Sequence, residues 1–187
     1  MEGRKPVTLR GSVLKHNVKA ILNLHGKAGW EKVKAHIPPH IVERIEKATV
    51  LEPLEPEIFA ALHEALRQVF GGDKWEASFA VGSEAARVEF GGVYRVVLRA
   101  VQYDTIWDRI ERTWNHIVGA GAFRWIERRE GYVSAEIVGV TGFHPGIWAS
   151  AAGRAERLLV MSGAKSASVT MLQASPTRAT FEAYWMT

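Results

Sequence analysis

Apolar residues in the first half of the chain recur at the spacing of an α-helix. Between residues 12 and 25 they fall on one side of a helix, and Gly26 follows as a stop signal. Between residues 57 and 70 they recur at spacings of four, four and three before Gly71. Both segments are predicted to be amphipathic helices, separated by short helical segments and proline breaks. The apolar positions are Val13, Leu14, Val18, Ile21 and Leu22 in the first helix and Ile58, Leu62, Leu66 and Val69 in the second.

Two further helices are predicted from residues that suit the N-cap position. Asp73 is a suitable N-cap for a helix that ends at a pair of glycines. Asp104 or Thr105 is suitable for a helix over residues 106–118, whose apolar residues share one face. Residues 93–101 between these helices fit either a helix or a strand.

The hydrophobic period changes to two in the last third of the chain. From Tyr132 to Ile137 every second residue is aliphatic, which is typical of a strand with one buried face. Residues 124–140 and 167–185 each show two short extended runs around a turn, and residues 145–161 between them have a helical pattern. This order predicts an α+β fold, in which a helical N-terminal half packs on a small antiparallel sheet formed by two C-terminal strand pairs flanking a helix.

Length and composition favour one soluble unit. The chain has 187 residues, of which 47% are hydrophobic, and no repeat or linker divides it, so residues 1–187 are expected to form a single domain. Neither a secretory signal nor a run of about 18 apolar residues occurs, so no membrane span is expected and the predicted location is cytoplasmic. The net charge of +4 is mild and well mixed, which does not favour nucleic-acid binding.

Several chemistries lack the residues they need. Cysteine is absent, which excludes thiolate metal sites and cysteine nucleophiles. The closest histidine pair, His36 and His40, flanks two prolines and does not form a helical chelate, so no metal site is predicted. No serine lies in a GxSxG motif, and no glycine pair lies in a phosphate-binding motif. No catalytic residue is therefore predicted.

Tryptophan is the most informative residue type, with seven in the chain. Four of them fall in or next to elements that would cover the predicted sheet. Large aromatic rings pack in cores, but they also line apolar pockets and dominate interfaces. If the cluster forms a ligand pocket, the predicted ligand-binding residues are Trp107, Trp114, Trp125, Trp148 and Tyr132.

The last third of the chain also shows a familiar set of features. They are the Tyr132 strand, Phe143-His144-Pro145-Gly146, a helix to Leu158-Leu159, Ser162-Gly163-Ala164 and the final Phe181-Glu182-Ala183-Tyr184-Trp185. With the segment from Gly26 to Pro38, they resemble the myxobacterial paralogous family of unknown function DUF2378. The element order is also similar to the superfamily of V4R, TRAPP-component and haem-NO-binding domains. This resemblance implies a module that holds an apolar ligand or a protein partner.

The chain departs from the chemistry of two of these subfamilies. TRAPP-type proteins carry an acyl chain on cysteine, which this chain lacks. The haem-NO-binding family uses Tyr-x-Ser-x-Arg to bind the haem propionates, and here Tyr132-Val133-Ser134-Ala135 is followed by Glu136. A glutamate would place like charge beside a propionate. The nearest upstream histidine, His116, is closer in sequence than that family's proximal histidine, so neither haem nor any other cofactor is predicted.

The sequence favours a non-catalytic cytoplasmic module for signalling or scaffolding, which forms a homodimer and binds a protein partner or an apolar small molecule. The first alternative is an enzyme or small-molecule sensor with an aromatic-lined pocket, in which Glu136 or His144 is the acid–base group. The second is a weak nucleic-acid-associated protein that uses two basic clusters. They are Lys27, Lys32, Lys34, Arg44 and Lys47 in the first third of the chain, and Arg124, Arg128 and Arg129 near Trp125.

Overall fold

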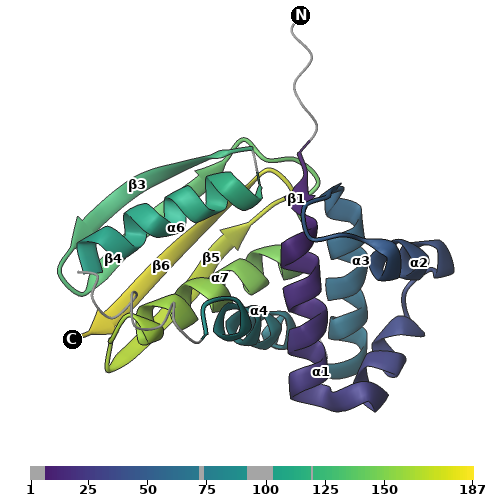
Figure 1. The fold of residues 1–187 in the computed structure, drawn as a ribbon. Helices are drawn as coiled ribbons and strands as arrows, with labels where there is room; N and C mark the ends of the chain where they lie inside the picture. The colour runs from purple at the N-terminus through teal and green to yellow at the C-terminus, as the bar shows by residue number, and fades with distance from the viewer. Residues whose placement is uncertain (1–6, 72–73, 92–102, 119) are drawn as a thin grey trace, which may run out of the picture.

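The computed structural model describes residues 7–71, 74–91, 103–118 and 120–187. The helical first half lies beside a four-stranded antiparallel sheet, which confirms the predicted α+β class (Figure 1). The segment 93–101, for which the sequence left helix and strand open, lies outside the described residues.

Helices make up the first half of the chain. The predicted stop is confirmed at Gly26, which has a non-helical backbone where two helical segments meet at a kink within the first helix. Its φ of 68° and ψ of −177° are readily adopted by glycine, and the helix resumes after it. The bounds are Gly11–Lys34 for α1, Pro39–Lys47 for α2, Pro56–Leu66 for α3 and Glu76–Glu89 for α4, and a π-helical turn, η1, continues α3 over Arg67–Gly71.

Helix α6 spans Tyr103–Ile117 and begins earlier than its capping signals indicate. Asp104 and Thr105 therefore lie inside the helix, and the N-cap prediction for them is wrong. The other predicted cap, Asp73, lies outside the described residues, and α4 begins without a side-chain cap hydrogen bond. Most helical stability in a folded protein comes from packing of the apolar face, so a helix can begin away from a capping signal.

The two predicted strand pairs join into one sheet of order β3-β4-β6-β5. The pairing of β4 with β6 unites them, with Tyr132 opposite Tyr184 and Val138 opposite Arg178. The strands are β3 at Ala122–Arg129, β4 at Tyr132–Val138, β5 at Ser166–Ala174 and β6 at Arg178–Met186. A two-residue ladder between β1 (Leu9–Arg10) and β2 (Pro53–Leu54) was not predicted, since it is too short to leave a pattern.

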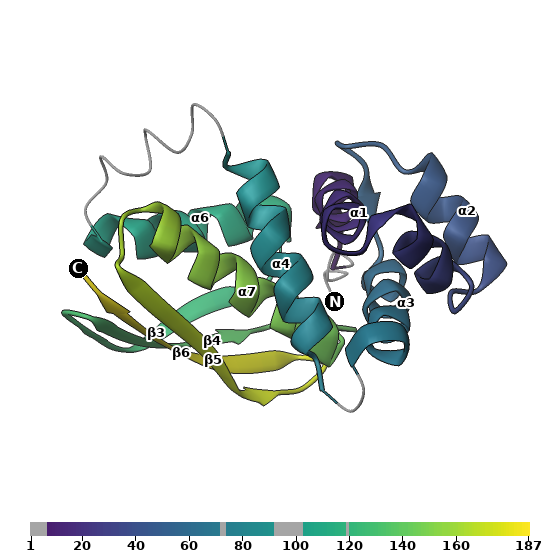
Figure 2. The same cartoon turned by 90° about the horizontal axis from the view of Figure 1, so that it is seen from below.

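One face of the sheet is covered by helices. Helices α6 and α7, the latter spanning Pro145–Met161, lie over the same face, and α4 crosses α7 on the side of α1 and α3 (Figure 2). Within the described residues, none of the helices has the length and apolar character needed to cross a bilayer.

Helices α4 and α7 approach each other at two glycines. A Cβ atom at Gly82 would lie 2.0 Å from the backbone oxygen of Ser150, and one at Gly153 would lie 2.1 Å from that of Phe79. These distances are far below van der Waals contact, so only glycine allows the two backbones to pack this closely.

Replacing Gly153 with alanine is therefore expected to force the helices apart and to lower the free energy of unfolding by about 1–3 kcal/mol. The measurement is urea denaturation followed by circular dichroism. Gly71→Ala is the matched control, because a Cβ there would meet its nearest neighbour at 3.6 Å. If the two variants were equally stable, close packing of α4 against α7 would not be a stability determinant.

Candidate functional site

A cavity of about 110 Å³ lies between the sheet, α6, α7 and the helical half of the molecule. Each of these parts contributes to its wall, and most of the wall is aliphatic or aromatic. The cavity is of the same order as an engineered cavity of about 150 Å³ that stays dry and binds benzene. Representative lining residues are Trp107 and Trp114 on α6, Ala155 on α7, Val133 on β4, Phe181 on β6 and Phe59 on α3.

Strand β4 presents its aliphatic residues to the cavity. Val133, Ala135 and Ile137 all line it. Because successive side chains on a strand point to opposite faces, Tyr132 and Glu136 face away from the cavity. This alternation is the one that the sequence predicts for a strand with one buried face.

Four of the predicted ligand-binding residues, the tryptophans, join in one chain of ring contacts. Trp114 is stacked on Trp148, with centroids 5.7 Å apart and an interplanar angle of 4°. Phe123 lies 5.9 Å from Trp114 and 5.5 Å from Trp125, which contacts Trp107 at 6.2 Å. Trp107 and Trp114 line the cavity directly, whereas Trp125 and Trp148 stand behind them. The structure thus brings these four residues together around one space.

The fifth predicted residue, Tyr132, lies apart from this group. Its hydroxyl donates a hydrogen bond of 2.9 Å to Glu182 Oε1, and its ring packs against Tyr184 at a centroid distance of 4.8 Å. Trp185, which the sequence reasoning did not select, packs against Trp107 at 5.7 Å. Trp185 lies on the face of β6 that points toward the helices, and the alternation of side chains along this strand could have identified it.

One edge of the cavity is polar, and the sequence reasoning missed it. Arg154 on α7 donates from Nη1 to Glu89 Oε2 at 2.7 Å and from Nη2 to Asn17 Oδ1 at 2.8 Å. Asn17 Nδ2 in turn lies 3.5 Å from His63 Nε2. All four residues line the cavity, although they come from four different helices. Their wide separation along the chain leaves no local motif.

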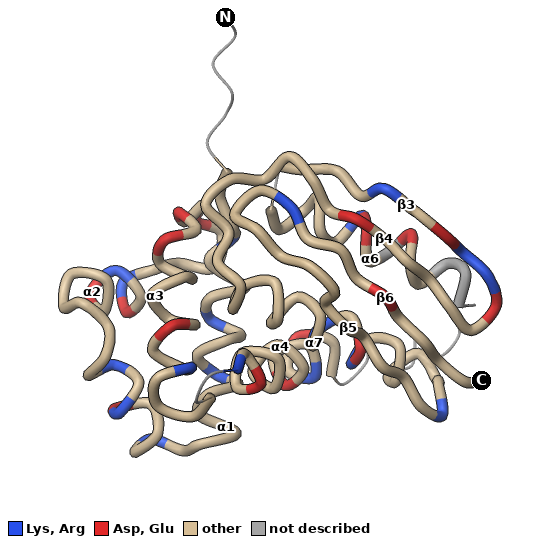
Figure 3. The backbone as a smooth tube through the Cα atoms, turned by 180° about the vertical axis from the view of Figure 1, so that it is seen from behind, with Lys and Arg blue, Asp and Glu red and all other residues tan. Residues whose placement is uncertain are grey.

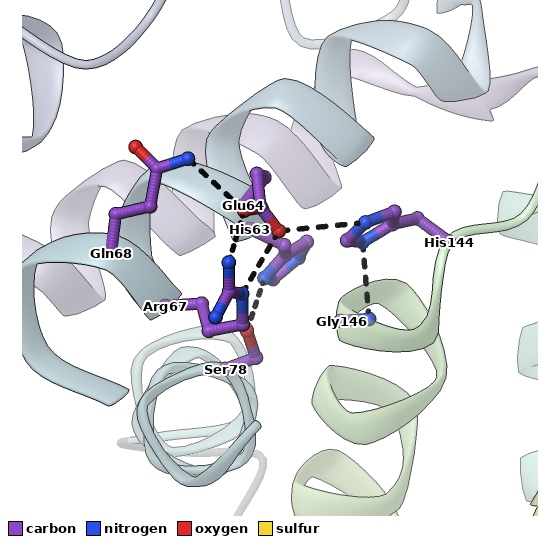
Figure 4. A network of polar contacts seen from close by, with 7 residues as sticks. All are labelled: His63, Glu64, Arg67, Gln68, Ser78, His144 and Gly146. Carbon is purple, nitrogen blue, oxygen red and sulfur yellow. Dashed lines mark hydrogen bonds and ion pairs between the residues drawn. The ribbon is translucent and has the colours of Figure 1, made fainter. Parts of the chain in front are cut away.

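His63 is held as a neutral imidazole. Burial lowers its pKa to about 3, and the nearby positive charges of His144 and Arg154 act in the same direction. Its Nδ1 lies 3.1 Å from the Ser78 hydroxyl, as Figure 4 shows. If Nε2 accepts from Asn17, then Nδ1 carries the proton and donates to Ser78. Neither ring nitrogen is left without a partner.

His144 and Glu64 form a second polar group near His63 (Figure 4). His144 Nδ1 accepts from the Gly146 amide at 3.3 Å and so caps α7, and its Nε2 lies 3.8 Å from Glu64 Oε2. Hydrogen bonds from Arg67 hold the pKa of Glu64 below its usual value, while burial lowers the pKa of His144. His144 does not line the cavity, so it has a structural role at the start of α7.

The lowered pKa of His63 predicts a loss of stability in acid. The unfolded chain binds the proton with the ordinary pKa of 6.5, whereas the folded protein resists it until about pH 3. The neutral, buried His63 therefore contributes its full share to the free energy of unfolding above pH 6.5. This share is lost as the pH falls toward about 3. Between about pH 7.5 and about pH 5 the free energy of unfolding should fall by roughly 2 kcal/mol from this group.

The measurement is the free energy of unfolding as a function of pH for the wild type and for His63→Gln. The variant should show a flatter profile between these pH values, even if it is less stable overall. His36→Gln changes an exposed histidine and is the matched control. An unchanged slope in His63→Gln would show that His63 is not the buried neutral group described.

The acid–base groups considered from the sequence do not reach the cavity. Glu136 on the outward face of β4 lies 3.9 Å from Arg124 Nη1 and 3.7 Å from Arg178 Nη1. The basic cluster on β3 is likewise paired with carboxylates, since Arg128 lies 3.1 Å from Asp108 and Arg129 lies 2.8 Å from Glu127. Figure 3 shows basic and acidic residues interspersed along this edge of the sheet. Neither arrangement favours catalysis by Glu136 or binding to nucleic-acid phosphates.

Solved structures similar to this chain are H-NOX proteins. The Fe(II) unliganded H-NOX protein from K. algicida has a TM-score of 0.67 at 9% identity, covering 96% of this chain and 97% of that one. A single-residue variant of Tt H-NOX has a TM-score of 0.64 at 14% identity and 96% coverage of both chains. A Cs H-NOX mutant with 4-cyano-L-phenylalanine has a TM-score of 0.66 at 12% identity, covering 96% of this chain and 97% of that one.

The comparison defines the fold as that of H-NOX domains, and at these identities it defines the fold alone. It agrees with the similarity to haem-NO-binding domains seen in the element order. No family model and no curated protein matches the chain, so the resemblance to DUF2378 stays a prediction.

The described residues around the cavity do not fit a haem, the group named for two other similar structures. His63 is the only histidine among the described lining residues, which include no methionine or tyrosine, and both its ring nitrogens are engaged. His116 on α6 is exposed to solvent, and Glu136 faces away.

Purified protein is therefore expected to show no Soret band, and added haemin should keep the spectrum of unbound haemin. The measurement is an absorption titration, with bovine serum albumin as a haemin-binding positive control. A shifted Soret band with one-to-one stoichiometry would contradict this expectation.

Proposed function

We propose that this protein is a non-catalytic domain that binds a small apolar molecule in the cavity beneath α6 and α7. The observation that carries the proposal is the cavity itself, whose wall combines tryptophan, phenylalanine and aliphatic side chains. The cavity is partly open to solvent, and a ligand that fills it would remove this apolar wall from water, which is favourable. Its order of size suits a molecule with one six-membered ring or a short branched chain.

The polar edge supports binding over catalysis. Arg154 and Glu89 neutralise each other, and His63 is neutral with both nitrogens engaged. No base is left poised near the cavity by these groups, which argues against the enzyme alternative. The cavity also touches α1 and α3 as well as the sheet half. Ligand binding would therefore stabilise the contact between the two halves, which is what a sensor domain requires.

The sequence also predicts a homodimer, a protein partner and a cytoplasmic location, and these stay predictions. Of the two kinds of ligand that the sequence left open, the cavity favours the small molecule. A protein partner would need an exposed surface, whereas the predicted tryptophans point inward or support the inward ones.

Toluene is a suitable first probe, because it fills a benzene-sized apolar site. Toluene is expected to bind with one-to-one stoichiometry and to raise the melting temperature. Ala155→Leu adds a side chain to the cavity wall and should weaken toluene binding at least tenfold, while filling the void raises stability by about 0.5–2 kcal/mol.

Binding is measured by isothermal titration calorimetry and melting by differential scanning calorimetry. Ala28→Leu is the matched control, since Ala28 lies on the exposed surface of α1. Wild-type protein that does not bind toluene, or Ala155→Leu protein that binds it as tightly as Ala28→Leu does, would overturn the assignment of the cavity as a binding site.

A further inference from the structure

Arg154 is an unusual residue for the wall of an apolar cavity. Its side chain is only 12% exposed, yet it carries a positive charge at the polar edge of a cavity whose wall is mostly aliphatic and aromatic. A guanidinium has five N–H donors, and Glu89 and Asn17 accept one hydrogen bond each from the two terminal nitrogens of Arg154. Within the described part of the chain, Arg154 Nε is buried without a partner. Nε has almost no accessible surface, so a ligand acceptor in the cavity would take a remaining N–H of the terminal nitrogens, since Arg154 lines the cavity.

The charge around Arg154 decides what kind of acceptor fits. Glu89 Oε2, 2.7 Å away, already balances the guanidinium charge. A ligand carboxylate would place a second negative charge beside Glu89 and would lose its hydration in an apolar space. A neutral oxygen acceptor avoids both costs and still accepts a charge-assisted hydrogen bond.

We propose that the ligand of the cavity is a neutral apolar molecule with a carbonyl oxygen, and that Arg154 donates a hydrogen bond to that oxygen. This inference rests on the proposed function of the cavity and specifies the class of its ligand. The hydrocarbon part of the ligand lies among Trp107, Trp114 and the sheet, and the carbonyl lies at the polar edge. Ketones, esters and quinones of one-ring size belong to this class.

Trp107 is the competing donor, because its Nε1 is also buried without a partner among the described residues. Trp107 packs between Trp125 and Trp185, with ring centroids 6.2 and 5.7 Å away. It offers one neutral donor, whereas Arg154 offers a charged group with several. Hydrogen bonds from an ionised donor are roughly twice as strong as neutral ones. Arg154 is therefore the assigned partner.

The test compares toluene with cyclohexanone, which has the same number of non-hydrogen atoms and adds a carbonyl. Both dissociation constants are measured calorimetrically on the wild type and on Arg154→Met/Glu89→Met, which removes the ion pair together. Replacing a buried pair by apolar residues of similar volume is often neutral for stability. The double variant should bind cyclohexanone roughly tenfold more weakly, equivalent to about 1.4 kcal/mol, and should bind toluene within about twofold of the wild type.

Toluene binding is the internal control for an intact cavity. If the double variant loses toluene binding, Arg154→Lys replaces it in the comparison of the two probes. This variant keeps the positive charge but removes the planar guanidinium, and it should bind cyclohexanone more weakly while toluene affinity is unchanged. If the affinities for the two probes changed equally, or not at all, the role of Arg154 would be overturned. The proposed function of the cavity would still stand. Failure of the wild type to bind toluene would instead refute the proposed function.

Two further measurements identify the residue that donates the hydrogen bond and test whether the ligand is neutral. Trp107→Phe removes the indole N–H but keeps an aromatic ring, and it should not change the ratio of the two affinities. A selective loss of cyclohexanone binding in that variant would assign the carbonyl to Trp107 and overturn the proposal. Benzoate should bind the wild type at least tenfold more weakly than cyclohexanone, and tighter benzoate binding would contradict a neutral ligand.

Discussion

Close packing of α4 against α7 determines the position of the other features around the cavity. Two glycines, Gly82 and Gly153, allow the helix backbones to approach within a distance that a methyl group would prevent. Helix α7 carries Trp148 and Arg154, and α4 ends at Glu89, which pairs with Arg154. The crossing therefore sets both the aromatic stack and the polar edge.

The H-NOX-like fold and the residues that line the cavity lead to different conclusions about the ligand. The fold is shared with H-NOX proteins over nearly the whole chain, yet the described residues around the cavity do not supply a free axial ligand for a haem. Function resides in the site and is not fixed by the fold. Here the site offers aromatic walls, one neutralised arginine and a neutral histidine, and the proposed function rests on this combination.

The sequence predicts those parts of the structure that depend on local periodicity. The alternation from Tyr132 to Ile137 identifies which strand residues face the cavity, and the tryptophan positions predict the aromatic cluster. The stop predicted at Gly26 corresponds to the break between the two helical segments of α1. The bond between Asn17 and Arg154 escapes prediction, because the two residues are 137 positions apart and meet only through tertiary packing.

Locating a bound atom in the cavity tests the central claim most directly. Xenon binds dry apolar cavities and is visible by crystallography, so the decisive measurement is a diffraction experiment on a crystal of this protein pressurised with xenon. The expected result is a xenon atom beside Trp107 and Trp114, between α6 and the inward face of β4. Xenon found only at other sites, or side chains that fill this space, would contradict a ligand-binding cavity.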